Sequence, residues 1–251
     1  MLGSGTSTGV PRIGNDWGEC DPHEPRNRRT RVSIAIENEA GGRVLIDTST
    51  DLRAQLLATG IEKVDAVFWT HDHADHCHGI DDLRVMRYDR SNSIPGFAGN
   101  TTFRSLQRRF DYIFAGQHGY PSIVELRHLE QLRLVAGFSV DWVEMPHGPV
   151  TSTGFRFEAD GKSIAYATDF SEVTPGMLRC FAKVDILVTD CLRRRPHPTH
   201  AHLEMALAFA KRCGARRAVL THLDKSMDYR PLCAEVPSWV TVGFDGLELA
   251  A

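Results

Sequence analysis

The sequence predicts a mixed α/β (α+β) fold in which strands and helices alternate along the chain. Two observations support this class. Apolar runs rich in β-branched residues, such as 64–70 and 184–190, are typical of buried strands. The stretch 200–213 instead places apolar residues at helical spacing, ends before a glycine and leads into another strand over 217–221.

The N-terminal part of the chain predicts a glycine-rich loop, two strands and a helix. Residues 3–11 lack the Gly-Lys-Ser/Thr ending of a phosphate-binding P-loop, so this motif is rejected. We interpret them as a tight loop, and an anion held by their backbone N–H groups stays an alternative. Strands are expected over 32–37 and 43–48. Asp51 is expected to cap a helix that Gly60 ends.

Residues 84–135 form a basic, aromatic segment whose secondary structure the pattern leaves open. Such a segment can bind a phosphorylated ligand. An amphipathic cover with solvated arginines explains the same composition, so no substrate-binding residue is assigned. The arginines concerned are Arg84, Arg87, Arg90, Arg104, Arg108 and Arg109. We expect the segment to cover a single domain over residues 1–251, because the chain shows no linker, repeat or low-complexity tract.

Charge, hydropathy and cysteine content restrict the setting in which the protein works. The formal net charge is -3, so no global basic field points to nucleic acid or an anionic membrane. No apolar run reaches the length of a membrane span, and the first residues lack the features of a secretory signal. The 6 cysteines are scattered, without a Cys-x-x-Cys pair, and are interpreted as reduced thiols. We therefore expect a cytoplasmic protein with no membrane partner.

Histidines gather directly after one predicted strand. The stretch 71–76 reads His-Asp-His-Ala-Asp-His and follows the apolar run 64–70. Imidazoles and carboxylates this close together are costly to place without a cation. Neutral imidazole nitrogen and carboxylate oxygen are the ligands that Zn²⁺ and similar ions bind. A solvated, charged loop is the alternative, but the tight pattern and its place after a strand favour a metal site.

Three further predicted strands end at candidate ligands, namely His147, Asp169 and His222. Strand ends on one side of a sheet converge in space, so we predict that these residues join the histidine stretch in one site. Counting ligands favours two divalent ions, zinc or manganese, each with an open position. The assignment is His71, His73 and His147 for one ion, Asp75, His76 and His222 for the other, and Asp169 as the bridge.

In this order, these residues resemble the ligand set of the metallo-β-lactamase superfamily over nearly the whole chain. Four stretches are similar to the phosphoribosyl 1,2-cyclic phosphate phosphodiesterases of that superfamily and to the related tRNA 3′-processing endonucleases. They are residues 3–11, 27–31, 79–84 and 198–200. The resemblance implies a four-layer αββα sandwich with a dinuclear site at the sheet edges. Relatives often bind a structural zinc through an N-terminal cysteine cluster, of which this chain keeps only Cys20.

The resemblance implies a dinuclear metal-dependent hydrolase, most directly a phosphodiesterase that cleaves a small or cyclic phosphodiester or a nucleotide. Two metals lower the pKa of a shared water to roughly 7 and so provide hydroxide at neutral pH. Asp75 is expected to bind metal and also to orient this hydroxide. The resemblance makes His200 the general acid that protonates the leaving alkoxide. His78 and His118 are left unassigned.

Other functions stay open at this stage. An RNA 3′-end nuclease is one, although the net charge of -3 and the lack of a long inserted arm count against nucleic acid as the partner. Thioester, lactone or β-lactam hydrolysis is another, and the Pro-Thr-His stretch favours phosphate over it. A metal-binding scaffold without catalysis is opposed by the intact ligand set. The physiological substrate, the native metal and the oligomeric state, with a dimer as one option, are left open.

Overall fold

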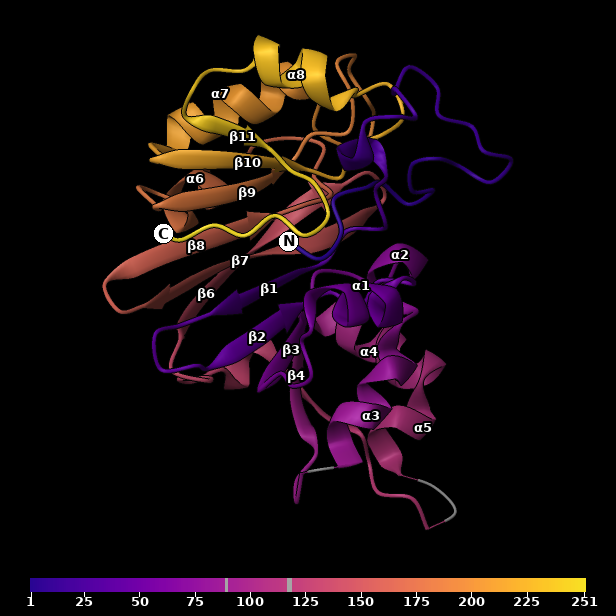
Figure 1. Ribbon diagram of the computed structural model, residues 1–251. Coiled ribbons are helices and arrows are strands. Elements are labelled where there is room, and N and C mark those ends of the chain that lie inside the picture. The colour runs from indigo at the N-terminus through magenta and orange to yellow at the C-terminus, as the bar shows by residue number, and fades with distance from the viewer. Residues whose placement is uncertain (89, 117–118) are drawn as a thin grey trace.

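Two β-sheets pack face to face in the computed structural model, which describes residues 1–88, 90–116 and 119–251 (Figure 1). Helices cover the outer face of each sheet. Three separate clusters of buried apolar side chains fill the boundaries between these four layers. This arrangement confirms the α/β class and the αββα layer order that the resemblance implied.

The first sheet comes from the N-terminal half of the chain. Its strand order is β1-β2-β3-β4-β5, in which β1 and β2 pair antiparallel and the other neighbours are parallel. The strands are β1 (Ile34–Glu37), β2 (Arg43–Ile46), β3 (Ala66–Trp69), β4 (Ile94–Ala98) and β5 (Val124–His128). The helical elements of this half are η1 (Pro25–Asn27), α1 (Leu52–Thr59), α2 (Ala74–Cys77), η2 (Ile80–Asp82), α3 (Leu83–Tyr88), α4 (Asn100–Arg109), α5 (Asp111–Ala115) and η3 (Leu129–Gln131).

The second sheet comes from the C-terminal half and has the order β11-β10-β9-β8-β7-β6. Strands β6, β7 and β8 pair antiparallel, whereas β8, β9, β10 and β11 pair parallel. The strands are β6 (Ser139–His147), β7 (Val150–Ala159), β8 (Lys162–Ala167), β9 (Ile186–Asp190), β10 (Arg217–Thr221) and β11 (Val240–Val242). Helices α6 (Pro175–Cys180), α7 (Leu203–Cys213) and α8 (Tyr229–Glu235) belong to this half.

Strand β3 shows why its sequence is apolar at every position. Successive side chains of a strand point to opposite faces. Val67 and Trp69 therefore pack among the helices of the first half, whereas Phe68 points between the sheets. There Phe68 stacks on Phe97 with ring centroids 5.1 Å apart and meets Phe157 edge-on at 5.1 Å. A strand buried on both faces reads as a continuous apolar run, as this one does.

Two sequence expectations are corrected by the structure. The helix expected from residue 200 begins only at Leu203, so His200 lies in the preceding loop. Asp51 occupies the N-cap position of α1, but its side chain makes no capping hydrogen bond. Its carboxylate instead pairs with the Arg31 guanidinium, at 2.9 Å between Nη1 and Oδ1. The basic segment 84–135 adds β4 and β5 to the first sheet as well as covering helices.

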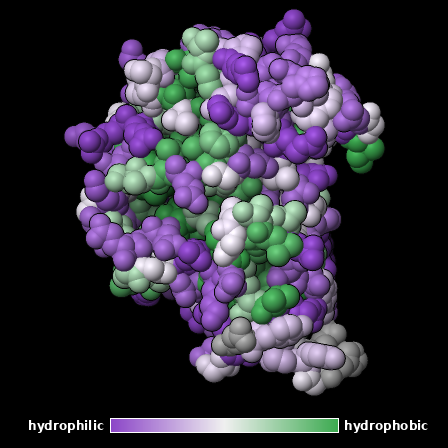
Figure 2. Space-filling view, viewed as in Figure 1, coloured by the Kyte–Doolittle hydropathy of each residue, from purple (hydrophilic) through white to green (hydrophobic). Residues whose placement is uncertain are grey.

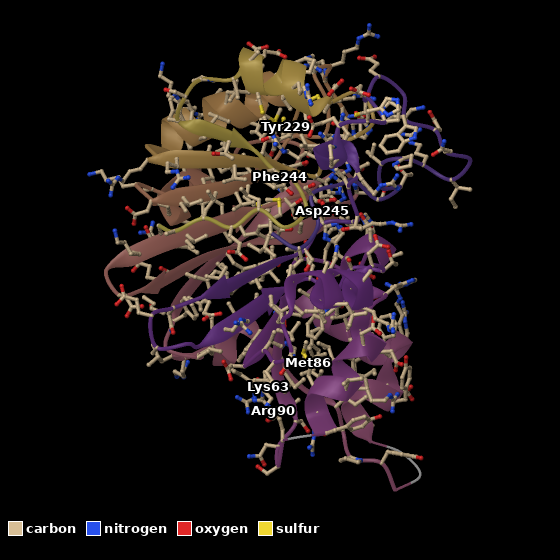
Figure 3. The ribbon with its side chains drawn as sticks, viewed as in Figure 1. Lys63, Met86, Arg90, Tyr229, Phe244 and Asp245 are labelled. Carbon is tan, nitrogen blue, oxygen red and sulfur yellow. The ribbon has the colours of Figure 1, made fainter. Side chains whose placement is uncertain are left out.

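The C-terminal segment holds the N-terminal loops in place (Figure 3). The Asp245 carboxylate accepts hydrogen bonds from the backbone N–H and hydroxyl of Ser4, at 2.9 and 2.8 Å. It also accepts them from the same two groups of Thr30, at 2.7 and 2.6 Å. Tyr229 and Phe244 lie near the Arg26 guanidinium, with ring centroids 4.7 and 5.7 Å from its carbon. Asp245 thus anchors the N-terminal loop through Ser4 and Thr30.

Apolar surface gathers over the middle of the face shown in Figure 2. It includes a groove of about 360 Å³ beside the C-terminal segment, lined in part by Ile34, Ile36, Val188 and Val219. None of the predicted site residues lines this groove. Within the described part of the chain, every helix is too short or too polar to cross a bilayer.

Candidate metal centre

Strand ends from both sheets meet at one edge of the sandwich. In the first sheet the parallel strands β2 and β3 lead to Asp47 and His71, and in the second β8, β9 and β10 lead to Asp169, Asp190 and His222. Strand β6 is antiparallel to β7 and so runs like β8, which brings its last residue to the same edge. The predicted ligands therefore come from elements far apart in sequence.

Three of these strand ends carry unusual backbone geometry. Asp47, Asp169 and His222 have φ angles of 63°, 60° and 61°. Residues other than glycine seldom adopt positive φ, because it costs about 1–3 kcal/mol and persists only where the surrounding structure holds the residue there. Such residues concentrate at functional sites. The backbone conformation and the side chains thus both indicate a functional site at this edge.

The first group of candidate ligands contains His71, His73 and His147, together with Asp169. The Nε2 atom of His71 lies 2.9 Å from Nδ1 of His73, which is 3.4 Å from Nε2 of His147. Oδ2 of Asp169 is 3.7 Å from the Nε2 atom of His71 and 3.5 Å from that of His147. One ligand atom from each residue lies within 4.8 Å of all the others, a spacing that a single ion can span.

The second group contains Asp75, His76 and His222. Oδ2 of Asp75 lies 3.4 Å from Nε2 of His76 and 3.6 Å from Nε2 of His222. The other Asp169 oxygen, Oδ1, lies 3.4 and 3.5 Å from the same two nitrogen atoms. Asp169 thus turns one oxygen toward each group, which is the position that a bridging carboxylate takes. The structure brings all seven predicted ligands together.

Hydrogen bonds outside the centre decide which nitrogen of His71, His76 and His147 faces it. Nδ1–H of His76 donates to Asp47 at 2.7 Å, and Nδ1–H of His147 donates to the Thr199 carbonyl at 2.7 Å. The Thr70 hydroxyl donates to Asp47 at 2.8 Å, and its oxygen accepts from Nδ1–H of His71 at 3.0 Å. The Nε2 lone pairs of His71, His76 and His147 are therefore aimed inward, as in histidine metal sites, whereas His73 turns Nδ1 toward the first group.

Asp47 was not among the predicted site residues, although the sequence carries a signal for it. It ends a predicted strand, as His71 and Asp169 do. It is completely buried and accepts hydrogen bonds from the Thr70 N–H, the Thr70 hydroxyl and His76. It contacts the candidate ligand His76 from outside the cluster, which is why ligand counting did not select it.

The buried nitrogen atoms of this cluster fit a bound cation. Nε2 of His76 and both ring nitrogens of His222 are buried without a hydrogen-bond partner among the described residues. An unpaired buried polar atom is costly, and a metal ion would satisfy the inward-facing ones. The imidazole and carboxylate donor set suits zinc and manganese.

The charges of the cluster divide its histidines into two kinds. Burial lowers the pKa of His71 and His147, so both stay neutral and ready to bind a cation. Burial opposes a charge on His222 as well, but Asp169, Asp75 and Asp190 together raise its pKa to about 9. Carboxylates also raise the pKa of His76 well above its usual value, against the effect of burial. Without metal, His76 and His222 carry protons that an incoming cation displaces.

His200 is held beside the second group by a carboxylate that the sequence analysis did not select. Nδ1–H of His200 donates to Oδ2 of Asp190 at 3.2 Å, and the Ala201 N–H donates to the same oxygen at 3.1 Å. Oδ1 of Asp190 lies 3.6 Å from Nδ1 of His222. His200 is also close enough to Asp169 and His222 for the three to form a further group of possible ligands. With Nδ1 occupied by Asp190, Nε2 is the nitrogen left for other partners.

His78 and several arginines of segment 84–135 lie outside the centre. His78 contacts the Arg109 guanidinium, which also bonds to Asp72 at 3.2 Å. His118 falls outside the described residues. Several arginines of segment 84–135 bind other parts of the protein. They are Arg84 with Asp81, Arg87 with the Ser122 carbonyl and Arg90 with the Val64 carbonyl.

A cavity of about 260 Å³ opens onto the cluster. Predicted site residues form most of its walls. Pro149 and Val150 add an apolar part, and Ser7 of the N-terminal loop completes the lining. The lining residues are Ser7, His73, Asp75, His147, Pro149, Val150, Asp169, Thr199, His200 and His222. A larger groove of about 800 Å³ near α7 and α8 contains none of the predicted site residues, so we place the chemistry in the smaller cavity.

Comparisons with known proteins bear on this arrangement. A family model described as a β-lactamase superfamily domain matches residues 42–223. The chain is similar to a new diphosphatase from the PhnP family, whose crystal structure gives a TM-score of 0.88 at 36% identity. That match covers 99% of this chain and 94% of the other.

Two curated relatives are similar over part of their own length. Octanoyltransferase of Porphyromonas gingivalis is 34% identical over 257 residues, which cover 99% of this chain. The chain spans only 50% of the length of that relative. Ribonuclease Z of Bradyrhizobium diazoefficiens is 27% identical over 143 residues, covering 55% of this chain and 47% of the relative.

Proposed function

We propose, from the premise that this chain belongs to the metallo-β-lactamase superfamily of metal-dependent hydrolases, that it cleaves a P–O bond in a small phosphodiester or diphosphate. One observation carries the proposal: two ligand groups share Asp169 beside His200, an imidazole held by a carboxylate. Phosphoryl transfer requires charge neutralisation at the phosphoryl oxygens and a proton for the leaving oxygen. This cluster offers residues for both tasks.

Two divalent cations, zinc or manganese, are the proposed cofactors. Their ligands are His71, His73 and His147 for one, Asp75, His76 and His222 for the other, and Asp169 for both. When bound, such ions supply Lewis-acid charge and lower the pKa of water to roughly 7. Asp75 lines the cavity and is almost fully buried, so we assign it the additional task of orienting the attacking water.

His200 is the proposed general acid. Asp190 accepts a hydrogen bond from Nδ1–H and stabilises the imidazolium form, which leaves Nε2–H to protonate the leaving oxygen. His200 lines the same cavity as Asp75, so both groups can act on one bound phosphoryl group. Asp190 is a positioning residue in this scheme because it acts through His200.

The size of the cavity favours a small substrate. About 260 Å³ is slightly below the usual range for small-molecule sites, roughly 300–1,000 Å³. The solved relative that is 36% identical is described as a diphosphatase, which supports a phosphoanhydride beside the phosphodiester. An RNA 3′-end nuclease stays the second candidate, since a ribonuclease Z is 27% identical over 55% of the chain.

A turnover screen of the zinc- and manganese-loaded protein tests the proposal. The substrates are bis-p-nitrophenyl phosphate, cyclic nucleotides, ribose cyclic phosphate, a nucleoside diphosphate, a short RNA, a thioester and a lactone. We expect metal-dependent cleavage of at least one small phosphorus substrate, at a higher kcat/KM than for RNA. Turnover confined to the thioester or lactone would contradict the proposal, and a preference for RNA would support the second candidate.

A further inference from the structure

His73 differs from the other histidines of the first ligand group, because no outer hydrogen bond holds its ring. The rings of His71 and His147 are fixed from outside by the Thr70 hydroxyl and the Thr199 carbonyl. The His73 ring contacts only those two histidines, through Nδ1, and its Nε2 has no hydrogen-bond partner among the described residues. His73 is also exposed, whereas His71 and His147 are buried. The position of His73 therefore depends mainly on its backbone.

The backbone of His73 belongs to the start of a very short helix, α2. The N–H groups of His76 and Cys77 donate to the His73 carbonyl at 3.0 and 3.1 Å, and the His78 N–H donates to the Ala74 carbonyl at 3.0 Å. A helix this short is not stable by itself in water. Contacts with other parts of the protein must therefore hold it.

Arg109, the last residue of α4, bonds to both ends of α2. Its Nη1–H donates to the backbone carbonyl of Asp72 and, at 3.2 Å, to Oδ2 of the same residue. Its Nη2–H donates to Nε2 of His78. The Ser105 hydroxyl, one helical turn earlier, also donates to the Asp72 carboxylate. Asp72 precedes His73 and His78 follows α2, so these contacts, the α2 clamp, enclose the segment that carries the ligand.

Helix α4 is itself fixed to the core of the first half. Leu106 is buried in the same apolar cluster as Trp69 of β3. Phe110, the residue after Arg109, packs against that cluster, and its ring centroid lies 5.4 Å from the guanidinium carbon. The guanidinium thus keeps a fixed position relative to the strand that leads to the ligands.

The same contacts argue against Arg109 as a residue that binds substrate phosphate. The cavity lining includes His73 but not Asp72, Ser105 or Arg109. A half-exposed ion pair alone contributes little to stability. Here, however, the planar guanidinium binds a carboxylate, a carbonyl and an imidazole at once, a geometry that lysine cannot reproduce.

We propose that Arg109 is a positioning residue of the metal centre, which holds His73 in place for the first ion by fixing α2 through Asp72 and His78. The inference rests on the proposed two-ion centre. The second ion depends less on the α2 clamp, because Asp47 holds its ligand His76 directly at 2.7 Å. At this position the basic segment serves metal binding rather than substrate binding.

Stepwise zinc titration of Arg109→Ala tests the proposal. We expect the affinity for one ion to fall about tenfold, since outer partners of ligands contribute 10–100-fold, and the affinity for the other to stay close to the wild-type value. Arg109→Lys should recover part of the loss, because an ammonium group retains some of the bonds.

Two backgrounds identify the ion that is affected. His222→Ala removes a ligand of the second group, and there the added Arg109→Ala change should still weaken zinc binding about tenfold. His147→Ala removes a ligand of the first group, and there the added change should have little effect. An unchanged zinc affinity in Arg109→Ala, or an equal loss in both backgrounds, would overturn the proposal.

Arg108→Ala is the matched control. Arg108 is the neighbouring residue of the same helix, carries the same charge and is exposed, and within the described residues it makes no hydrogen bond or ion pair. Both zinc affinities should stay at the wild-type values in this variant. A loss equal to that of Arg109→Ala would show that the charge of α4, rather than the α2 clamp, supports the ion, and would overturn the proposal.

Amide hydrogen exchange of the chelated protein tests the α2 clamp without metal. In Arg109→Ala the N–H groups of His76, Cys77 and His78 should exchange about tenfold faster, because lost hydrogen bonds make local opening easier. The Ala206 N–H, which donates to the His202 carbonyl at 2.9 Å in α7, should not change, whereas global destabilisation would speed its exchange too.

The exchange rates separate the failure of the proposed function from the failure of this inference. A wild type that binds no zinc would contradict the proposed centre, and the exchange rates would still support or overturn the α2 clamp. Unchanged exchange in Arg109→Ala, or faster exchange with wild-type zinc affinities, would overturn the positioning role.

Discussion

His200 and Asp190 form a pair in which each residue has a separate test. The imidazole lines the cavity, and the carboxylate behind it is completely buried. A buried carboxylate fixes the tautomer and the orientation of its histidine and stabilises the charged form. The acid should therefore matter most when the leaving group is a strong base.

We expect His200→Ala to slow the hydrolysis of an alkyl diester by about 10²–10⁴-fold, the usual range for general acid catalysis. A p-nitrophenyl diester should be slowed much less, because p-nitrophenolate leaves without a proton. Rates for the two substrates and the metal content are measured together. An equal loss on both substrates, or a lost metal ion, would mean that His200 is a ligand or a structural residue.

Asp190→Asn should impair both the acid and the second metal group. An amide presents the wrong partner to Nδ1–H of His200, so we expect about a 10²-fold fall in kcat on the alkyl diester. Metal affinity should fall about 10–100-fold, because Oδ1 lies 3.6 Å from the His222 ring. Asp185→Asn, at the other end of the same strand region, is the control and should affect neither. Wild-type kcat in Asp190→Asn would refute the pair.

At the scale of elements, the loop between β9 and α7 links the proposed acid to a candidate metal ligand. Nδ1 of His197 accepts hydrogen bonds from the Thr199 N–H at 3.3 Å and from its hydroxyl at 3.2 Å. The Thr199 carbonyl in turn accepts from Nδ1–H of His147 at 2.7 Å. The next residue is His200, so this one short loop positions the side chains of both His147 and His200.

Replacing His197 tests this link. His197→Ala should weaken binding of the first metal ion by about tenfold, since outer partners of ligands contribute 10–100-fold to affinity. His197→Asn should retain much of it, because an asparagine side chain also accepts from the N–H two residues on. Metal titration of the two variants provides the comparison. Equal losses in both would show that the ring itself, rather than its acceptor, is needed.

At the scale of the molecule, the candidate centre joins the two sheets. His71, His73, Asp75 and His76 follow β3 of the first sheet, whereas the other ligands follow strands of the second. An ion that binds only the folded state at 1,000 times its Kd stabilises it by about 4 kcal/mol. Chelation should therefore lower Tm by about 8–16 °C for a protein of this size. Elemental analysis should find about two ions per chain before chelation, and an unchanged Tm would contradict the joining role.

The metal-free protein should also respond to pH in a defined direction. The folded pKa of His222 is about 9, above its ordinary 6.5, because the surrounding carboxylates outweigh burial. The bound proton thus stabilises the fold fully below pH 6.5, and this contribution is lost as the pH rises through 9. Urea unfolding of chelated protein should show a lower free energy of unfolding at pH 9.5 than at 6.5. Metal-loaded protein should change less, because the cation has replaced the proton.

The sequence by itself determined the class of the site. The spacing of His71, His73, Asp75 and His76 after an apolar run, and the further strand ends at His147, Asp169 and His222, predicted a cluster of possible ligands. The structure brings them together, because parallel strands deliver their carboxyl ends to one edge. This information is local. An apolar run predicts a strand, and the residue that follows the run is predicted to lie at the edge of the sheet.

The tertiary structure alone decided the surroundings of that cluster. Asp190 ends a strand in the sequence too, but only the order β10-β9-β8 places it between Asp169 and His222 and behind His200. The Asp51 carboxylate forms an ion pair with Arg31 and does not cap its own helix. Ser7, which lies near the N-terminus in the sequence, lines the cavity. These contacts join residues distant in sequence, and strand order, which no local pattern encodes, determines which of them meet.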